Sequence, residues 1–311
     1  TPRSYSAAKA VLDGRFLATG SAPDTYTLEK GIRFTTSGSL GAFQFVVLDE
    51  TIPLNKDPAN TNYYITDPDN PIIAYQGRIV TTEYPANGAD DAQRYVIPEF
   101  NIDISTLKVR VYPTSSKTAN PIIYQTISDF TTSGGKGFRI SEEINFDEKS
   151  AIFFIFENSF GQYEIQFGNG IYGRKVNAGN LIELEYLITE GSAPNGINSR
   201  FVLQSNIPPV RSVETLRLRE NSRVSGGGGK ESNNQLKVNA QNNFVIQNRA
   251  VTADDYKNLI LSNFQFVDSV SVWGGEDNDP PIYGQSFITI KPKESQPLDQ
   301  PKLSKNAKKK A

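Results

Sequence analysis

The chain has 311 residues, of which 37% are apolar and 11% aromatic, and its 32 basic and 34 acidic residues leave a net charge of −2. At roughly 100–200 residues per domain, this length indicates two or three globular domains. Every apolar run is far shorter than the ~18 residues of a membrane-spanning helix, and the near-neutral charge argues against an electrostatic grip on nucleic acid. We therefore expect neither a membrane nor nucleic acid among its partners.

The chain contains no Cys, no His and no Met. Without Cys there is no disulfide, thiolate nucleophile or cysteine metal site, and without His the commonest general base and metal ligand is missing. A Ser-His-Asp triad, a zincin site and a zinc deaminase site are therefore excluded. Because even the first residue is not Met, we expect the chain to be part of a longer or processed protein.

Short segments of alternating apolar and polar residues, separated by 24 Gly and 18 Pro, predict half-buried strands along the first two thirds of the chain. The alternation is clearest at 26–34, around a turn at 30–31, and at 43–47, 102–111 and 182–188. Residues 55–72 and 85–93, rich in Pro, Asn and Asp, are interpreted as loops. The apolar run 151–156 predicts a strand that is covered on both faces or buried in an assembly contact.

Residues 163–180 contain a pattern that predicts a β-meander. Gly168-Asn169-Gly170 follows the alternating segment 163–167, and Asn-Gly supplies the positive φ values that a tight hairpin needs. We therefore expect a hairpin that returns along 171–176, with a further turn at 178–180.

The helical signal is confined mainly to the C-terminal third. Thr252 followed by Asp255 has the spacing of a capping box, which predicts a helix over 253–262. Two strand-like segments, 267–273 and 285–292, follow on either side of a Gly- and Pro-rich loop, and this order predicts a small α/β unit. The last ten residues contain five Lys and are typical of the start of a basic helix.

We therefore predict a mainly β, multi-domain chain of antiparallel, β-sandwich-like modules with a small C-terminal α/β module. Residues 1–75 are expected to form an N-terminal β-rich module and 76–205 a second one that holds the hairpin meander. Residues 206–235, which end in a Gly- and Ser-rich stretch, are expected to be a flexible linker. Residues 236–311 are expected to form the α/β module with a truncated basic C-terminal helix.

Two motifs suggest ligands only weakly. The Gly-rich stretch 226–230 lacks the P-loop pattern, because Val224 and Glu231 stand where that pattern has Gly and Ser or Thr. The carboxylate and amide clusters at 67–70 and 276–279 lack the spacing of an EF-hand and favour solvated loops. Of the two, the second is the better Ca²⁺ candidate, through Asp277 and Asp279.

Paired carboxylates, which a glycosidase needs, occur at Glu142 with Glu143 and at Glu183 with Glu185. The second pair alternates with apolar residues and is expected to face outward from a strand. A single Trp, Trp273, leaves little for the aromatic platforms of a sugar-binding cleft. We predict no catalytic, cofactor-binding or metal-binding residue, no cofactor and no enzymatic activity.

Three stretches resemble a known family when they are taken together and in order. They are ENSFGQYEIQFGNGIYGRKVNAGNLIELEYLITEG at 157–191, QNRAVTADDYKNLIL at 247–261 and DSVSVWGGEDNDPPIYGQSFITIKP at 268–292. In this arrangement the chain resembles the baseplate wedge proteins of T-even-type contractile-tailed bacteriophages, which belong to the wider baseplate J family. The resemblance covers most of the chain and implies a C-terminal-half fragment.

The resemblance implies a structural component of a phage tail baseplate, located in the virion and assembled in the host cytoplasm. Such a component joins wedges into a ring around the hub and links them to other wedge proteins and the sheath during assembly and contraction. An alternative of another class is a β-rich tail adhesin that binds a host surface glycan. An adhesin is expected to show repeats or clusters of surface Trp and Tyr; repeats are absent here.

We also expect the chain to associate with its own copies, as a two-fold dimer alone and as a ring in the virion. Sheet-rich modules expose edges and apolar strips that must be covered or paired. The candidate surfaces are 152–156 and the region around Trp273 and 282–283, with a weak preference for the C-terminal half.

Overall fold

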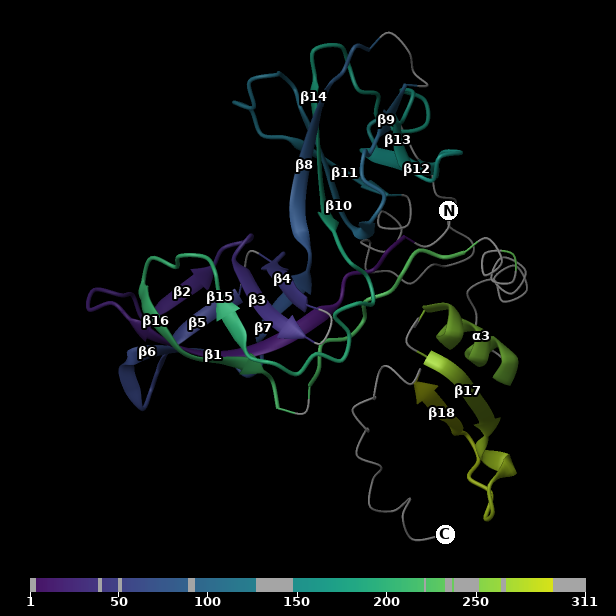
Figure 1. Ribbon diagram of the computed structural model, residues 1–311. Coiled ribbons are helices and arrows are strands. Elements are labelled where there is room, and N and C mark those ends of the chain that lie inside the picture. Colours follow the sequence, from purple (N-terminus) through teal and green to yellow (C-terminus); the bar gives the residue numbers. More distant parts are fainter. Residues whose placement is uncertain are drawn as a thin grey trace. The chain divides into compact units, whose positions relative to one another are not determined.

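The structure is a computed structural model that describes residues 4–38, 41–49, 52–88, 93–126, 148–220, 222–232, 237, 252–263 and 267–292. The fold is mostly β, as predicted, with antiparallel sheets and a small C-terminal helix (Figure 1). The chain divides into two compact units, residues 1–5 with 78–189 and residues 6–77 with 190–311. The first unit is thus an excursion of the chain between two parts of the second.

The second unit contains a nine-stranded sheet within the described residues, in the order β15-β3-β4-β7-β1-β6-β5-β2, with β16 also paired to β1. The strands are β1 (Lys9–Ala18), β2 (Thr25–Leu28), β3 (Arg33–Gly38), β4 (Gly41–Val47), β5 (Ile52–Asp57), β6 (Asn60–Thr66), β7 (Ile72–Gln76), β15 (Phe201–Leu203) and β16 (Val210–Leu218).

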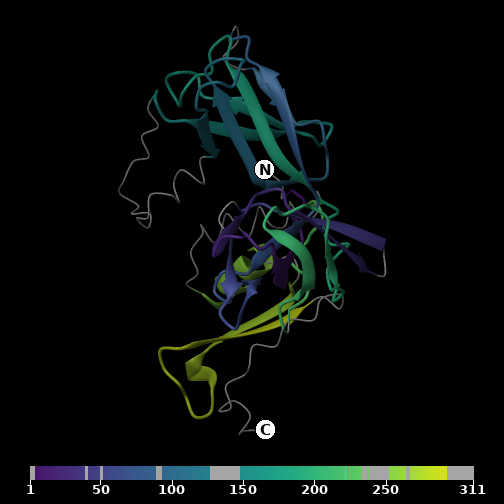
Figure 2. The ribbon, with the colours of Figure 1, turned by 90° about the vertical axis from the view of Figure 1, so that its left-hand side faces the viewer.

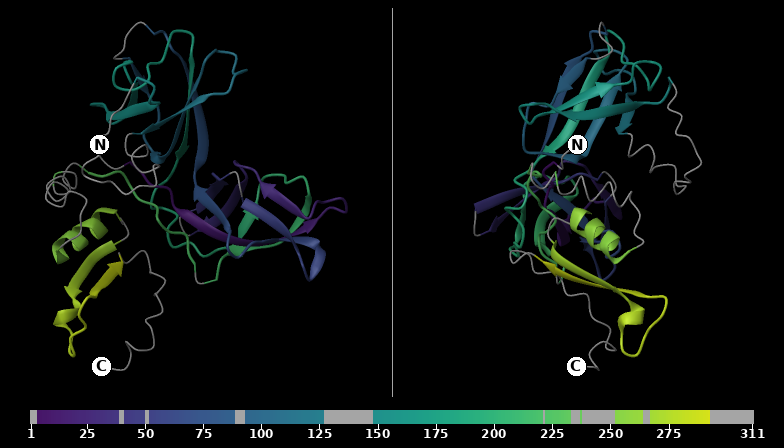
Figure 3. Two further views of the ribbon diagram at one scale, coloured as in Figure 1. Left: turned by 180° about the vertical axis from the view of Figure 1, so that it is seen from behind. Right: turned by 90° about the vertical axis from the view of Figure 1, so that its right-hand side faces the viewer.

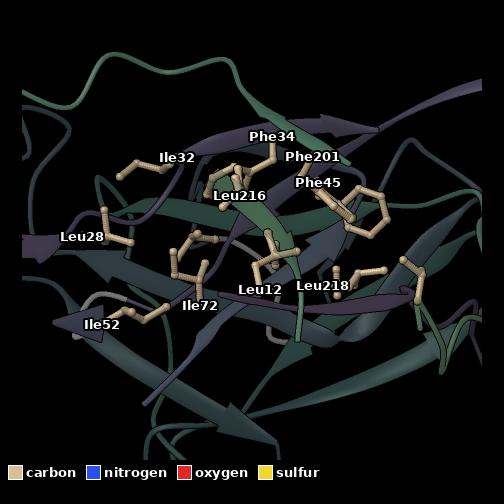
Figure 4. Packing of buried hydrophobic residues seen from close by; sticks show 14 of the residues in the cluster. Leu12, Leu28, Ile32, Phe34, Phe45, Ile52, Ile72, Phe201, Leu216 and Leu218 are labelled. Carbon is tan, nitrogen blue, oxygen red and sulfur yellow. The ribbon is translucent and has the colours of Figure 1, made fainter. Parts of the chain in front are cut away.

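Alternation explains the core of this sheet. Along β1 every second residue from Ala10 to Phe16 is buried, so one face of the strand turns inward. The inward side chains of the other strands meet it in one apolar cluster, in which the rings of Phe45 and Phe201 pack edge to face at 5.2 Å (Figure 4). Strands that precede the first unit in the chain, β1 to β7, and strands that follow it, β15 and β16, therefore build a single core.

The first unit contains a seven-stranded sheet within the described residues, in the order β8-β14-β10-β11-β12-β13-β9. The strands are β8 (Arg78–Pro85), β9 (Arg94–Val96), β10 (Ile102–Tyr112), β11 (Ile122–Thr126), β12 (Ile152–Glu157), β13 (Tyr163–Phe167) and β14 (Leu181–Ile188). The long strands β8, β14 and β10 lie side by side in Figures 1 and 2. All pairs are antiparallel except β11 with β12, which run parallel.

The two ends of this sheet meet across its core. Tyr84 of β8 donates a hydrogen bond to the carbonyl of Val96 in β9, and the rings of Tyr84 and Tyr95 are 5.7 Å apart. The sheet therefore closes around one apolar cluster rather than lying flat.

The C-terminal module consists of α3 (Ala253–Asn263), β17 (Val267–Gly274), the 3₁₀ turn η1 (Gly275–Asp277) and β18 (Ser286–Pro292). Strands β17 and β18 pair antiparallel, and α3 packs against β17 (Figure 3). No helix of the described residues has the length and apolarity needed to cross a bilayer.

Three interpretations of the sequence are corrected. Residues 55–72, expected to be a loop, contain the end of β5 and all of β6; the exposed polar residues 60–62 lie at the turn end of this hairpin, whereas Tyr64 and Thr66 further along β6 are buried. Gly168-Asn169-Gly170 does not turn a hairpin, since β13 pairs with β12 and β9 and no strand follows until β14. Instead, the Asn169 side chain accepts hydrogen bonds from the next backbone amides and curls the chain into a compact loop.

The third correction concerns the expected linker at 206–235. Its first part is β16, which pairs with β1 from Leu218 to Val210. Its Gly-rich part forms bridges to the start of the same unit, Gly228 with Ser6 and Ser225 with Lys9. Glycine allows this close backbone approach. Because β7, β15 and β16 all belong to the same sheet, the expected module boundaries at 75 and 205 cut through that sheet.

Candidate functional site

The acidic clusters singled out in the sequence do not converge in the described part of the chain. Within it, no group of three or more Asp or Glu side chains could hold a metal ion. Asp277 and Asp279 are both exposed, and Asn278 between them accepts a hydrogen bond from the Trp273 indole at 3.2 Å. The loop thus contributes a hydrogen-bond acceptor to Trp273. Glu142 and Glu143, the other carboxylate pair, lie outside the described residues.

The cluster at 67–70 is a local turn. The carboxylate of Asp67 accepts hydrogen bonds from the Asp69 backbone amide at 2.9 Å and from the Asn70 side chain at 3.2 Å. These bonds lower the pKa of Asp67. The backbone of the turn thus uses the oxygens that a cation would need.

Glu183 belongs to a charge network on β14 rather than facing solvent as expected. Its side chain is 9% exposed and accepts hydrogen bonds from Arg110 at 2.9 Å and from Lys117. Arg110 also reaches Glu185 at 3.2 Å, and Lys117 reaches Glu83 at 2.5 Å. Both cations therefore tie β10 and the loop after it to the neighbouring strands β14 and β8.

The electrostatics of this network oppose one catalytic role for Glu183, that of a glycosidase general acid. Burial raises the pKa of Glu183, but the hydrogen bonds from Lys117 and Arg110 outweigh it, so that the net pKa lies below its usual range. The hydrogen bonds to Glu183 and Glu83 raise the pKa of Lys117. A glycosidase acid must keep its proton near neutral pH, and Glu183 instead stays ionised.

The capped helix of the C-terminal module forms as predicted. The amide of Thr252 donates to the Asp255 carboxylate at 2.8 Å, and the amide of Asp255 donates to the Thr252 hydroxyl at 3.2 Å. These reciprocal bonds satisfy two of the amides that a helix start leaves without partners. Residues 253–262, expected to be helical, lie in α3.

The hairpin beside α3 has one well-packed end. Trp273 of β17 and Phe287 of β18 are cross-strand partners whose rings stack with centroids 5.8 Å apart and planes 14° apart. At the same end, Gly275 pairs with the backbone of Gln285 at 2.7 Å and accepts from Ile282 at 2.8 Å. These contacts fix the loop that separates the two strands.

The rest of the hairpin exposes apolar side chains. Val272, on β17 beneath α3, is buried, but its cross-strand partner Ile288 is 45% exposed. Ile290, on the same face of β18, is 36% exposed, and Tyr283 in the loop is 80% exposed. In the described part of the chain β18 pairs only with β17, so its outer edge is open. This combination is the strongest candidate in the module for an association surface.

The apolar run at 151–156 has a different explanation. Strand β12 lies inside the sheet between β11 and β13, and Ile152 and Phe153 are buried there. Phe156 at its end is 37% exposed, with the Arg94 guanidinium 4.7 Å from its ring. Burial within its own unit therefore explains most of the apolar residues of this segment.

Comparison with known proteins finds a family similar to the C-terminal module. Residues 252–309 match the family described as "Baseplate structural protein gp6, C-terminal domain I". This region resembles a baseplate structural domain. The match begins at the helix cap and includes the α3-β17-β18 module, and it supports a structural role in a baseplate for the chain.

No curated protein matches the chain. Among solved structures it is similar to a chain in the cryo-EM structure of the anti-feeding prophage baseplate, at 12% identity and a TM-score of 0.30. That likeness covers 90% of this chain and 46% of the other, so this chain spans less than half of it. A likeness at this level does not establish a shared fold.

Proposed function

We propose that this chain is a structural component of a contractile-tail baseplate, of the wedge type, with no catalytic role. It would join wedges into a ring around the hub and connect them to other wedge proteins and to the sheath. It would act in the virion after assembly in the host cytoplasm. The observation that carries the proposal is the match of residues 252–309, on a region folded as a capped helix with an open-edged hairpin.

The second part of the proposal is that the chain pairs with its own copies, as a two-fold dimer and within the ring. Helix α3 lies over β17 and leaves Ile288 and Ile290 of β18 exposed beside an unpaired edge. Two such edges can pair about a two-fold axis and bury each other's isoleucines. A lasting contact of this kind needs more than about 1,000 Å² of buried surface.

Labelling of intact tails tests the first part. Antibodies against this chain should mark the baseplate in electron micrographs, at the end of the sheath. Marking confined to fibre tips would instead favour the alternative of a glycan-binding adhesin, and the absence of the chain from purified tails would refute the proposal.

Light scattering over a wide concentration range tests the second part. The parent chain should approach twice the monomer mass, and Ile288→Lys should remain monomeric because it places a charge in the proposed contact. Ser271→Lys is the matched control, since Ser271 is exposed on β17, on the opposite face of the hairpin and away from the β18 edge, and should leave the dimer intact. A monomeric parent at the highest concentration, or equal effects of both variants, would contradict the proposed surface.

A further inference from the structure

One loop of the first unit presents two large apolar side chains to solvent. It runs from Gly168 to Gly173, between β13 and β14, and is called here the 168–173 loop. Ile171 is 69% exposed and Tyr172 is 68% exposed. Exposure of two adjacent apolar side chains of this size to water is unfavourable, and contacts within the described residues of the unit leave both of them uncovered.

Hydrogen bonds donated by the loop's own backbone amides hold it in one conformation. The Asn169 side-chain oxygen accepts hydrogen bonds from the amides of Ile171 at 3.0 Å and Tyr172 at 2.9 Å. The Gly170 amide donates to the Gly173 carbonyl at 3.0 Å, and both glycines have positive φ, 86° and 82°. The chain is therefore turned by residues that tolerate this geometry without strain.

Packing beneath the loop fixes it further. A Cβ on Gly168 would lie 2.3 Å from the Gly173 carbonyl carbon, and one on Gly173 would lie 2.6 Å from the Ile152 side chain. The Arg174 amide then donates to the Ser150 carbonyl at 2.7 Å. The loop thus packs against the start of β12, and its apolar tip is pre-organised before it binds a partner.

An exposed cation, Arg174, lies next to the tip. Arg174 follows the loop and is exposed, and Lys175 comes next, with its Cβ 3.8 Å from where a Gly170 Cβ would lie. Lys149 precedes Ser150, the residue that anchors Arg174. Among the described residues 148–150 and 174–175, Glu148 is the one carboxylate, and Arg174 is the exposed cation next to the tip. An aromatic side chain next to an arginine is the composition of interface hot spots.

We propose that the 168–173 loop is a docking knob, which inserts Ile171 and Tyr172 into an apolar pocket rimmed by carboxylates on another baseplate protein. The proposal rests on the proposed function. Pre-organisation favours a folded protein partner, because little ordering entropy remains to be lost on binding. A lipid bilayer is a poorer fit, since two side chains on a short rigid loop bury little apolar surface.

A second copy of this chain is also disfavoured as the occupant of this site. A two-fold contact of the loop with itself would bring the two copies of Arg174 together, and like charges at an interface repel. An acidic rim on a different protein would instead be attracted to Arg174 and its neighbours.

Site-specific photocross-linking tests the proposal in assembled tails. The full-length protein carries p-benzoylphenylalanine in place of Tyr172, and irradiated tails are analysed by mass spectrometry. The expected product joins position 172 to a different baseplate protein, at a peptide with Asp or Glu beside apolar residues. In the same background, Arg174→Glu should lower the yield by at least about fivefold, whereas Arg174→Lys, which keeps the charge, should retain it.

Each other outcome overturns the proposal. An adduct confined to another copy of this chain or to lipid refutes the stated partner, and tails that contain the chain but give no adduct refute the docking knob. Equal yields for Arg174→Glu and Arg174→Lys refute the acidic rim. Absence of the chain from purified tails refutes the proposed function and the knob together, so the two failures are distinguishable.

Discussion

Replacement of Gly227 by alanine tests whether the Gly-rich segment is docked or free. A Cβ at this position would lie 2.1 Å from the Gly191 carbonyl oxygen and 2.9 Å from the Ala8 Cβ. Because the nearer atom belongs to the backbone, a small side-chain adjustment cannot relieve the clash. We expect the alanine to force the segment away from the start of β1.

The cost follows from the hydrogen bonds that this displacement breaks. Asn195 accepts from the Gly227 amide at 3.0 Å and donates to its carbonyl at 2.8 Å. Ser6 and Gly228 exchange two further backbone bonds, both at 3.0 Å. At about 0.5–1.5 kcal/mol for each bond, the free energy of unfolding should fall by roughly 2–6 kcal/mol. The melting temperature of the unit should fall by on the order of 10 °C.

Urea and thermal unfolding followed by circular dichroism measure the change, with Gly229→Ala as the matched control. No atom lies within 4 Å of a Cβ at Gly229, and its φ is not in the left-handed region. The control should therefore stay within about 0.5 kcal/mol of the parent. If Gly227→Ala unfolds like Gly229→Ala, the segment is not docked and the linker interpretation is restored.

Two further substitutions test other parts of the structure. Glu183→Gln should lower the free energy of unfolding by about 1–2 kcal/mol near neutral pH, because its two cationic partners lose an ionised acceptor. Since folding lowers the pKa of Glu183, the difference from the parent should shrink as the pH falls through that lowered pKa, and a pH-independent difference in urea titrations would contradict the network. Phe287→Ala should destabilise the C-terminal module by about 1–3 kcal/mol and shift the emission of Trp273, the single Trp of the chain, to the red. Unchanged emission would contradict the stacked pair.

Features encoded by neighbours in the sequence could be predicted. Alternation at 43–47 and 182–188 identified β4 and β14, because apolar residues at every second position favour a strand with one face inward, although β14 proves buried on both faces along most of its length. Thr252 and Asp255 identified the start of α3, since both halves of a capping box lie within one turn. In each case the residues that form the signal are only a few positions apart, although sheet partners of the two strands lie further away in the chain.

Features that depend on distant partners could not be predicted. Strand β16 has an irregular burial pattern, and it is a strand because β1, about 200 residues earlier, pairs with it. Glu183 alternates like an outward residue, yet Lys117, from a loop 66 residues away, covers it. Strands β15 and β16 belong to the same sheet as β1 to β7, but they follow the whole of the first unit in the chain. No local sequence pattern reveals this pairing.

The glycines show most clearly why composition alone misleads. Gly-rich sequence favours a linker at 225–229 and a hairpin at 168–170, but the structure uses both segments for close packing. A third glycine, Gly173, was the available signal at the second site, because a residue suited to positive φ is unfavourable in a returning strand. Once the hairpin is replaced by a compact loop, Ile171 and Tyr172 no longer belong to a strand face. Their exposure is the observation on which the proposed docking knob rests, and position 172 is the site at which that proposal is tested.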